Sequence, residues 1–181
     1  EIYAPLDEVF TYVIPDTREG WQESTVALIN SFLIKGQKSI EFDYSEVRPY
    51  GAPIKTFGGT ASGPDPLIKL HQVIKKIFTG RAGEKLTTVD IADIGNLIGR
   101  CVVSGNVRRS AELLVGRIDD DNFLNLKNAE KFPERNSYDS ENPGWGWMSN
   151  NSVMVNVGTD FSKIVDGIIL NGEPGVIWED M

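Results

Sequence analysis

The chain contains one cysteine and one histidine in 181 residues, and this scarcity excludes several kinds of site. One thiol cannot form an internal disulfide, and one cysteine with one histidine is too few for a zinc cluster, so we expect no metal ligands. Apolar runs are only a few residues long, far below the roughly 20 that a membrane span needs. No signal peptide is recognisable at the start. We therefore expect a soluble, cytoplasmic protein without a membrane partner.

Basic residues are also in the minority. There are 18 lysines and arginines against 26 aspartates and glutamates, a net charge of −8, which argues against direct nucleic-acid binding. The 40% hydrophobic and 24% charged content is close to that of globular proteins, so disorder is not expected. The length fits one domain. Because the chain starts at Glu1 and stops soon after an apolar run at Trp178, we expect a piece of a larger protein.

Hydrophobic periodicity predicts helices that alternate with strands. Helices are expected at residues 16–34, 65–80, 88–103 and 161–170, with a short one that ends near Lys127. Strands are expected at residues 40–43, 111–115, 152–157 and 175–178. Asp16 and Glu19 have the spacing of a capping box, and Asp65 before Pro66 is typical of a capping carboxylate. The alternation predicts an α/β layer or barrel.

Two loops rich in glycine and proline interrupt this pattern. Residues 48–66 include Gly58–Gly63, which could approach a phosphate with its backbone N–H groups or serve as a structural loop. Residues 132–146 are polar and are expected to form a surface excursion. Trp145 and Trp147, at its end, could form a stacking platform or anchor the loop against the core.

The most informative stretch is residues 99–117, with four arginines and one glutamate in an acidic chain. A Gly-Asn turn joins a helix to a strand here, and Arg108 and Arg109 follow it directly. Guanidinium groups beside a flexible turn suit a phosphate or a base edge. The alternative is that both arginines pair with Asp119–Asp121 on the surface.

The two rare residues have simpler interpretations. His71 lies early in an amphipathic helix with no nucleophile or acid nearby in sequence, so a packed or solvated histidine is expected. Cys101 lies on a helical stripe with Ile91, Ile94, Leu97, Ile98 and Val102, which predicts a buried, inert thiol.

Seven phrases occur in an order that resembles a known family: residues 14–21, 47–54, 57–64, 96–99, 102–113, 149–153 and 171–175. The longest is Val-Val-Ser-Gly-Asn-Val-Arg-Arg-Ser-Ala-Glu-Leu. Together they resemble the monomeric, adenosylcobalamin-dependent ribonucleoside-triphosphate reductases, or class II ribonucleotide reductases. The resemblance spans nearly the whole chain and departs from the family only in a longer loop at residues 133–147.

The resemblance implies part of a ten-stranded α/β barrel, with residues 1–42 as the end of an inserted effector-site region and 43–181 as partial barrel. It also implies reduction of a ribonucleoside triphosphate by a cysteine thiyl radical, with adenosylcobalamin as cofactor in the complete enzyme and an external dithiol as reductant. The family's Asn-Pro-Cys-Gly-Glu phrase is absent here, and Cys101 lies where the family needs no cysteine. We therefore expect no catalytic residue and no cofactor bound by this segment alone.

By the same resemblance, one turn reads nucleotides between the substrate base and the allosteric effector. The expected substrate and effector contacts are Arg48, Ser104, Gly105, Asn106, Val107, Arg108, Arg109 and Ser110. The partners would be a ribonucleoside triphosphate, a deoxynucleotide effector and the remaining portions of the reductase. A non-catalytic nucleotide-binding module derived from a reductase is the alternative, whereas a hydrolase that uses His71 is weakly supported.

Overall fold

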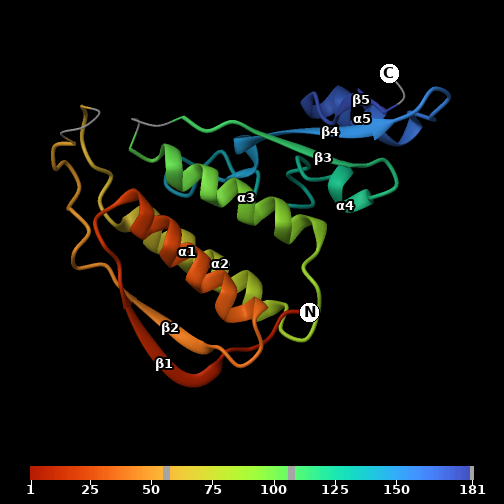
Figure 1. The fold of residues 1–181 in the computed structure, drawn as a ribbon. Helices are drawn as coiled ribbons and strands as arrows, with labels where there is room; N and C mark the ends of the chain where they lie inside the picture. Colours follow the sequence, from red (N-terminus) through yellow and green to blue (C-terminus); the bar gives the residue numbers. More distant parts are fainter. Residues whose placement is uncertain (55–57, 106–108, 180–181) are drawn as a thin grey trace. The chain divides into compact units, whose positions relative to one another are not determined.

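The protein is described by a computed structural model at residues 1–54, 58–105 and 109–179. These residues form two compact units, Glu1–Leu86 with Cys101–Arg109, and Thr87–Arg100 with Ser110–Met181. Each unit combines helices with a parallel sheet (Figure 1), which confirms the α/β prediction.

The first unit contains a two-stranded parallel sheet, β1 (Leu6–Val13) and β2 (Lys38–Asp43), with helices α1 (Arg18–Leu33) and α2 (Asp65–Gly80). Parallel strands need a crossover connection, and α1 provides it. The sequence pattern predicted β2 but not β1, because β1 is exposed along nearly its whole length and so lacks a two-residue hydrophobic alternation. The core lies between the helices, where the rings of Phe32 and Phe78 stack with centroids 5.4 Å apart.

The starts of both helices differ from the predictions. Thr17, not Asp16, caps α1, and its hydroxyl accepts from the Gly20 backbone N–H at 2.9 Å. The capping box was wrong because the Asp16 carboxylate accepts from Arg48 Nε instead, while the Thr17 hydroxyl takes the Gly20 N–H. In α2, Pro64 is the N-cap residue without a side-chain bond, and Asp65 lies inside the first turn.

The second unit contains a three-stranded parallel sheet in the order β3 (Glu112–Arg117), β4 (Ser149–Val155), β5 (Gly175–Trp178). Helices α4 (Asp121–Leu124) and α5 (Ser162–Asn171) and a 3₁₀ turn at Gly146–Met148 connect the strands. The core of this unit consists of six apolar side chains, Ala92, Phe123, Leu126, Val153, Val155 and Ile164. The expected helix near Lys127 ends earlier, at Leu124, because Lys127 turns its ammonium to the Gly146 and Ser149 carbonyls, at 2.7 Å each.

Helix α3 (Thr88–Val103) has the predicted bounds, but its buried face differs from the predicted stripe. Ile91 is 59% exposed, and Ile98 and Val102 are exposed as well. The polar Asn96 is fully buried instead. Hydrophobicity alone placed the stripe incorrectly, because the face of α3 that packs inward carries a polar network.

Candidate functional site

The turn at residues 104–110 follows α3 directly. Its first residue is tied back to the helix, since Ser104 Oγ donates to the Cys101 carbonyl oxygen at 2.7 Å. A Cβ on Gly105 would lie 3.8 Å from the Thr60 carbonyl oxygen and 3.9 Å from Ser62. The structure therefore brings Gly105 beside Thr60 and Ser62 of the glycine-rich loop, which lie more than 40 positions earlier in the sequence.

The predicted contacts Asn106, Val107 and Arg108 lie outside the described residues. Directly after these three residues, Arg109 is exposed and Ser110 is half-buried. The carboxylates proposed as alternative partners of the two arginines have other partners. Asp119 pairs with Arg117 at 2.8 Å, Asp121 lies 3.6 Å from Lys163, and Asp120 caps α4.

The glycine-rich loop is organised by its own backbone hydrogen bonds. Ala61 N–H donates to the Ala52 carbonyl at 2.8 Å, and Gly58 N–H donates to the Ile54 carbonyl at 3.0 Å. Gly63 has a φ of 72° and lies against Tyr50, where a Cβ would be 2.9 Å from the backbone nitrogen. These contacts favour the structural interpretation over the phosphate cradle, because the N–H groups of Gly58 and Ala61 are already used within the protein.

Arg48, the other predicted contact, forms an ion pair. Its Nε donates to Asp16 Oδ2 at 2.6 Å, and the Arg48 side chain is 40% exposed. The pair joins the segment after β2 to the start of α1. Because both side chains are partly exposed, the pair adds little stability, and the rest of the guanidinium faces outward from the unit.

His71 is buried within α2 and has hydrogen-bond partners on both ring nitrogens. Nδ1 lies 2.8 Å from the Tyr44 hydroxyl, and Nε2 lies 3.2 Å from Thr25 Oγ1. The Thr25 hydroxyl donates to the Trp21 carbonyl, so it accepts from Nε2–H. Nδ1 must then accept the Tyr44 proton. Burial lowers the pKa of His71 to about 4 and raises the pKa of Tyr44 to about 12, which fits a neutral imidazole and a protonated phenol. The prediction of a packed histidine is confirmed.

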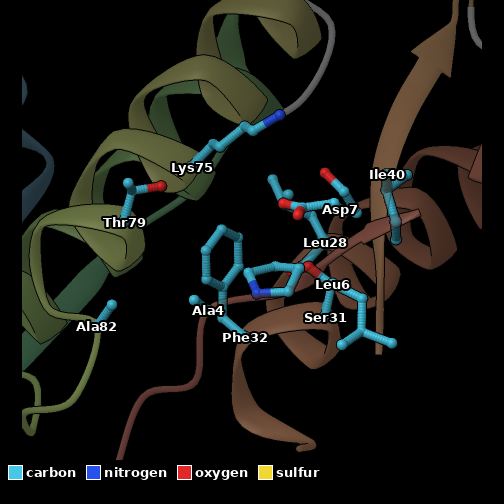
Figure 2. A pocket seen from close by; sticks show the side chains of 12 residues that line it. Ala4, Leu6, Asp7, Leu28, Ser31, Phe32, Ile40, Lys75, Thr79 and Ala82 are labelled. Carbon is cyan, nitrogen blue, oxygen red and sulfur yellow. The ribbon is translucent and has the colours of Figure 1, made fainter. Parts of the chain in front are cut away.

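A pocket of about 290 Å³ opens in the same unit between α1, α2 and the two strands. Figure 2 shows Leu28 and Phe32 among its side chains, with Lys75 and Asp7 nearby. Ser31 also lines the pocket, but its hydroxyl donates to the Leu28 carbonyl at 2.7 Å. The pocket is therefore lined by apolar side chains together with Asp7, Lys75 and three hydroxyl-bearing residues, Ser31, Ser39 and Thr79.

The second unit contains a buried polar network that the sequence analysis missed. Arg135 is only 2% exposed, donates to Asn96 Oδ1 at 2.6 Å and forms an ion pair with Asp93. Trp145 Nε1 donates to the same Asp93 at 2.6 Å. Burial raises the pKa of Asp93 despite the neighbouring guanidinium. The surface excursion predicted at residues 132–146 was wrong at Arg135, because a charge paired in this way can be buried.

The network continues along β4. Ser149 Oγ donates to Asn151 Oδ1 at 2.9 Å, and Asn151 N–H donates to Glu173 Oε2 at 3.1 Å. Lys127 Nζ lies 3.5 Å from Glu173 Oε1, and burial lowers the pKa of Lys127. The signal in the sequence was the Ser-Asn-Asn-Ser phrase at residues 149–152, whose first and third residues occupy the buried face of the strand.

The remaining candidates have structural roles. Trp145 anchors its loop through Asp93, as the second interpretation expected, whereas the Trp147 ring is 60% exposed and its Nε1 donates to the Gly144 carbonyl. Cys101 is buried, as predicted. Within the described part of the chain, no group of three or more histidine, cysteine and acidic side chains could hold a metal ion.

Comparison with known proteins defines the class of the chain. Residues 1–78 match the family described as the insertion domain of B12-dependent ribonucleotide reductase. A crystal structure of a B12-dependent, class II ribonucleotide reductase superposes on 96% of this chain with a TM-score of 0.77 and 40% sequence identity. In sequence and in fold, the chain therefore corresponds to a segment of the class II ribonucleotide reductases.

Curated relatives carry a more particular name. The adenosylcobalamin-dependent ribonucleoside-triphosphate reductases of Euglena gracilis and Lactobacillus gasseri are each 46% identical, over 93% and 94% of this chain. The probable enzyme of that name from Dictyostelium discoideum is 43% identical over 93% of the chain. The chain spans only about a fifth of the length of these relatives, 21–22%.

Two pockets in the described residues can be compared in size with the cofactor that these names imply. The pocket near Phe32 and a second one, beside α5, each measure about 290 Å³. Ligand pockets for drug-sized molecules already measure about 300–1,000 Å³, and a corrin ring with its nucleotide arm is larger than such molecules. Neither pocket fits adenosylcobalamin. Along the described residues, no helix is both long and apolar enough to cross a membrane.

Proposed function

We propose that this chain is the nucleotide-reading segment of an adenosylcobalamin-dependent ribonucleoside-triphosphate reductase. The observation that carries the proposal is the 40–46% identity to these enzymes over more than nine-tenths of the chain. In the complete enzyme, a ribonucleoside triphosphate loses its 2′-hydroxyl to give a deoxynucleotide for DNA synthesis. The contribution of this segment is to bind the substrate and a deoxynucleotide effector.

The proposed contacts are those inferred from the sequence, Arg48, Ser104, Gly105, Asn106, Val107, Arg108, Arg109 and Ser110. Arginine suits this role because its planar guanidinium stacks on a base and donates to phosphate at the same time, which lysine cannot reproduce. In the structure, Gly105 lies beside Thr60 and Ser62 of the glycine-rich loop.

The other parts of the reaction belong to the remaining portions of the reductase. They supply the thiyl cysteine, the reducing thiols and the site for adenosylcobalamin, and an external dithiol in the cytoplasm restores the thiols. Cys101 takes no part, because it is buried on α3. We also keep the division into an inserted effector-site region at residues 1–42 and partial barrel at residues 43–181 as part of the proposal.

The test is a chimera in which residues 1–181 replace the matching segment of the Euglena gracilis enzyme. The measurement is the ratio of reduction rates of two substrates, with and without a deoxynucleotide effector. We expect Arg108→Ala to reduce the effector-dependent change in this ratio by about tenfold or more, the effect of losing one charge-assisted contact. Arg18→Ala is the matched control, since Arg18 is exposed and contacts Glu19.

A chimera whose ratio responds to effector in the same way with and without Arg108 would refute the reading role. If the chimera binds nucleotides but never reduces them, while the parent enzyme does, the alternative of a non-catalytic nucleotide-binding module is favoured.

A further inference from the structure

The pocket between α1, α2 and the two strands of the first unit has no part in the proposed function (Figure 2). Its lining is mostly apolar, with the buried Leu28 and Phe32 from α1 and with Leu6 and Ile40 from the two strands. The volume of about 290 Å³ lies just below the range of about 300–1,000 Å³ that drug-sized ligands occupy. A ligand that fills this pocket is therefore a small molecule with an apolar part.

Strand β1 is irregular at the edge of this pocket. After Leu6, the paired positions on β2 are consecutive, but β1 has Asp7 and Glu8 in between. Consecutive side chains of a regular strand point to opposite faces, whereas Leu6 and Asp7 both line the pocket. Bulges of this kind redirect side chains and are frequent beside functional sites. The irregularity brings Asp7 to the pocket, while Glu8, which does not line it, pairs with Lys38.

The pocket has one basic and one acidic side chain, and they come from different elements. Lys75 approaches from α2 and Asp7 from β1 (Figure 2). Within the described part of the chain, neither side chain forms an ion pair or a hydrogen bond. The Ser31 hydroxyl is already donated to a backbone carbonyl, so Ser39 and Thr79 provide the other hydroxyl groups. Each charge therefore lacks a counterion among these residues.

The two charges restrict the chemistry of the ligand. A nucleotide would bring several phosphate charges close to Asp7, with only Lys75 to offset them. A pure hydrocarbon would displace water from both charges without replacing its hydrogen bonds, which is costly. A zwitterion satisfies both side chains, because its carboxylate can pair with Lys75 and its ammonium with Asp7. Such charge-assisted hydrogen bonds are the strong ones, and the apolar part of the ligand can then cover Phe32.

We propose that this pocket binds a small zwitterion with an apolar side chain, which is the chemistry of a free hydrophobic α-amino acid. None of the predicted nucleotide contacts among the described residues lines the pocket. The proposal therefore goes beyond the proposed function and does not depend on it. It gives the first unit a ligand site of its own, formed by α1, α2, β1 and β2.

The first test compares ligands on the parent chain by titration calorimetry. The probes are L-phenylalanine and L-leucine. The analogues 3-phenylpropanoate, which lacks the ammonium group, and 2-phenylethylamine, which lacks the carboxylate, keep the apolar ring. We expect each analogue to bind about tenfold more weakly than L-phenylalanine or worse, the effect of losing one hydrogen bond to a charged group. Analogues that bind as tightly as L-phenylalanine would overturn the requirement for both charges.

The second test removes each charge from the pocket. Lys75→Met and Asp7→Asn should each weaken L-phenylalanine binding by about tenfold or more, at an unchanged thermal midpoint because both side chains are exposed. The matched controls are Lys76→Met and Glu41→Gln, which make the same charge changes at exposed residues that do not line the pocket. Both controls should bind like the parent.

Three results would contradict the proposal. The first is that neither amino acid binds the parent chain at millimolar concentration. The second is parental affinity in both Lys75→Met and Asp7→Asn, which would place the ligand elsewhere. The third is an equal loss of affinity in the matched controls, which would make binding a matter of net charge alone.

Discussion

Acidification should destabilise the first unit through its buried His71. The pKa of this histidine falls from 6.5 to about 4 in the folded chain because burial disfavours the charged imidazole. Tyr44 donates to Nδ1 and Nε2–H faces the Thr25 oxygen, so the neutral ring already has a hydrogen-bond partner at each nitrogen. The folded state therefore keeps a neutral ring between pH 6.5 and 4, while the unfolded state takes up a proton.

The direction of the pH dependence follows from this difference. Stability is fully present above pH 6.5, falls as the pH drops toward 4, and loses nothing further to this group below that. A gap of about 2.5 between the two pKa values corresponds to about 3 kcal/mol. This loss is a large part of the free energy of unfolding of a typical domain, which is roughly 5–15 kcal/mol.

The assay is denaturant unfolding at pH 7.5 and pH 4.5, for the parent and for His71→Gln. Glutamine keeps a donor and an acceptor but does not titrate, and the carboxylates titrate in both proteins. On acidification, the free energy of unfolding of the parent should therefore fall by about 3 kcal/mol more than that of His71→Gln. Because the chain has one histidine, a single imidazole resonance also reports the pKa directly by NMR. A resonance that titrates near pH 6.5 in the folded chain would refute the argument.

Three further predictions concern other parts of the chain. The chain alone, with adenosylcobalamin and a dithiol, should form no deoxynucleotide, and any product measured by chromatography would contradict the assignment of chemistry to other segments. Cys101 should react with iodoacetamide far more slowly in the folded than in the unfolded chain, and Cys101→Ala should cost about 1 kcal/mol in denaturant unfolding; equal labelling rates would rule out burial. Gly116→Ala should destabilise by about 2 kcal/mol, because the new methyl overlaps the Phe123 ring, whereas Gly80→Ala, with open space around it, should not.

Much of the fold could be predicted because it depends on local pattern. Helix α3 has the predicted bounds, and the predicted strand at residues 175–178 coincides with β5. Strand β1 was missed because its exposed residues carry no alternation. The cap of α1 was misassigned because the Asp16 carboxylate pairs with Arg48, 32 positions away, which no local pattern shows.

The candidate site, like the fold, could be predicted from the sequence only in part. The sequence by itself determined the class of enzyme that the chain resembles and the burial of Cys101, because these depend on residue identity and order along the chain. Only the tertiary structure revealed the burial of Arg135 and the hydrogen bonds that Asn96 makes with Arg135 and with Glu112. These two hydrogen bonds join residues 39 and 16 positions apart, and a buried polar group is stable only when such distant partners converge on it, which no local pattern encodes.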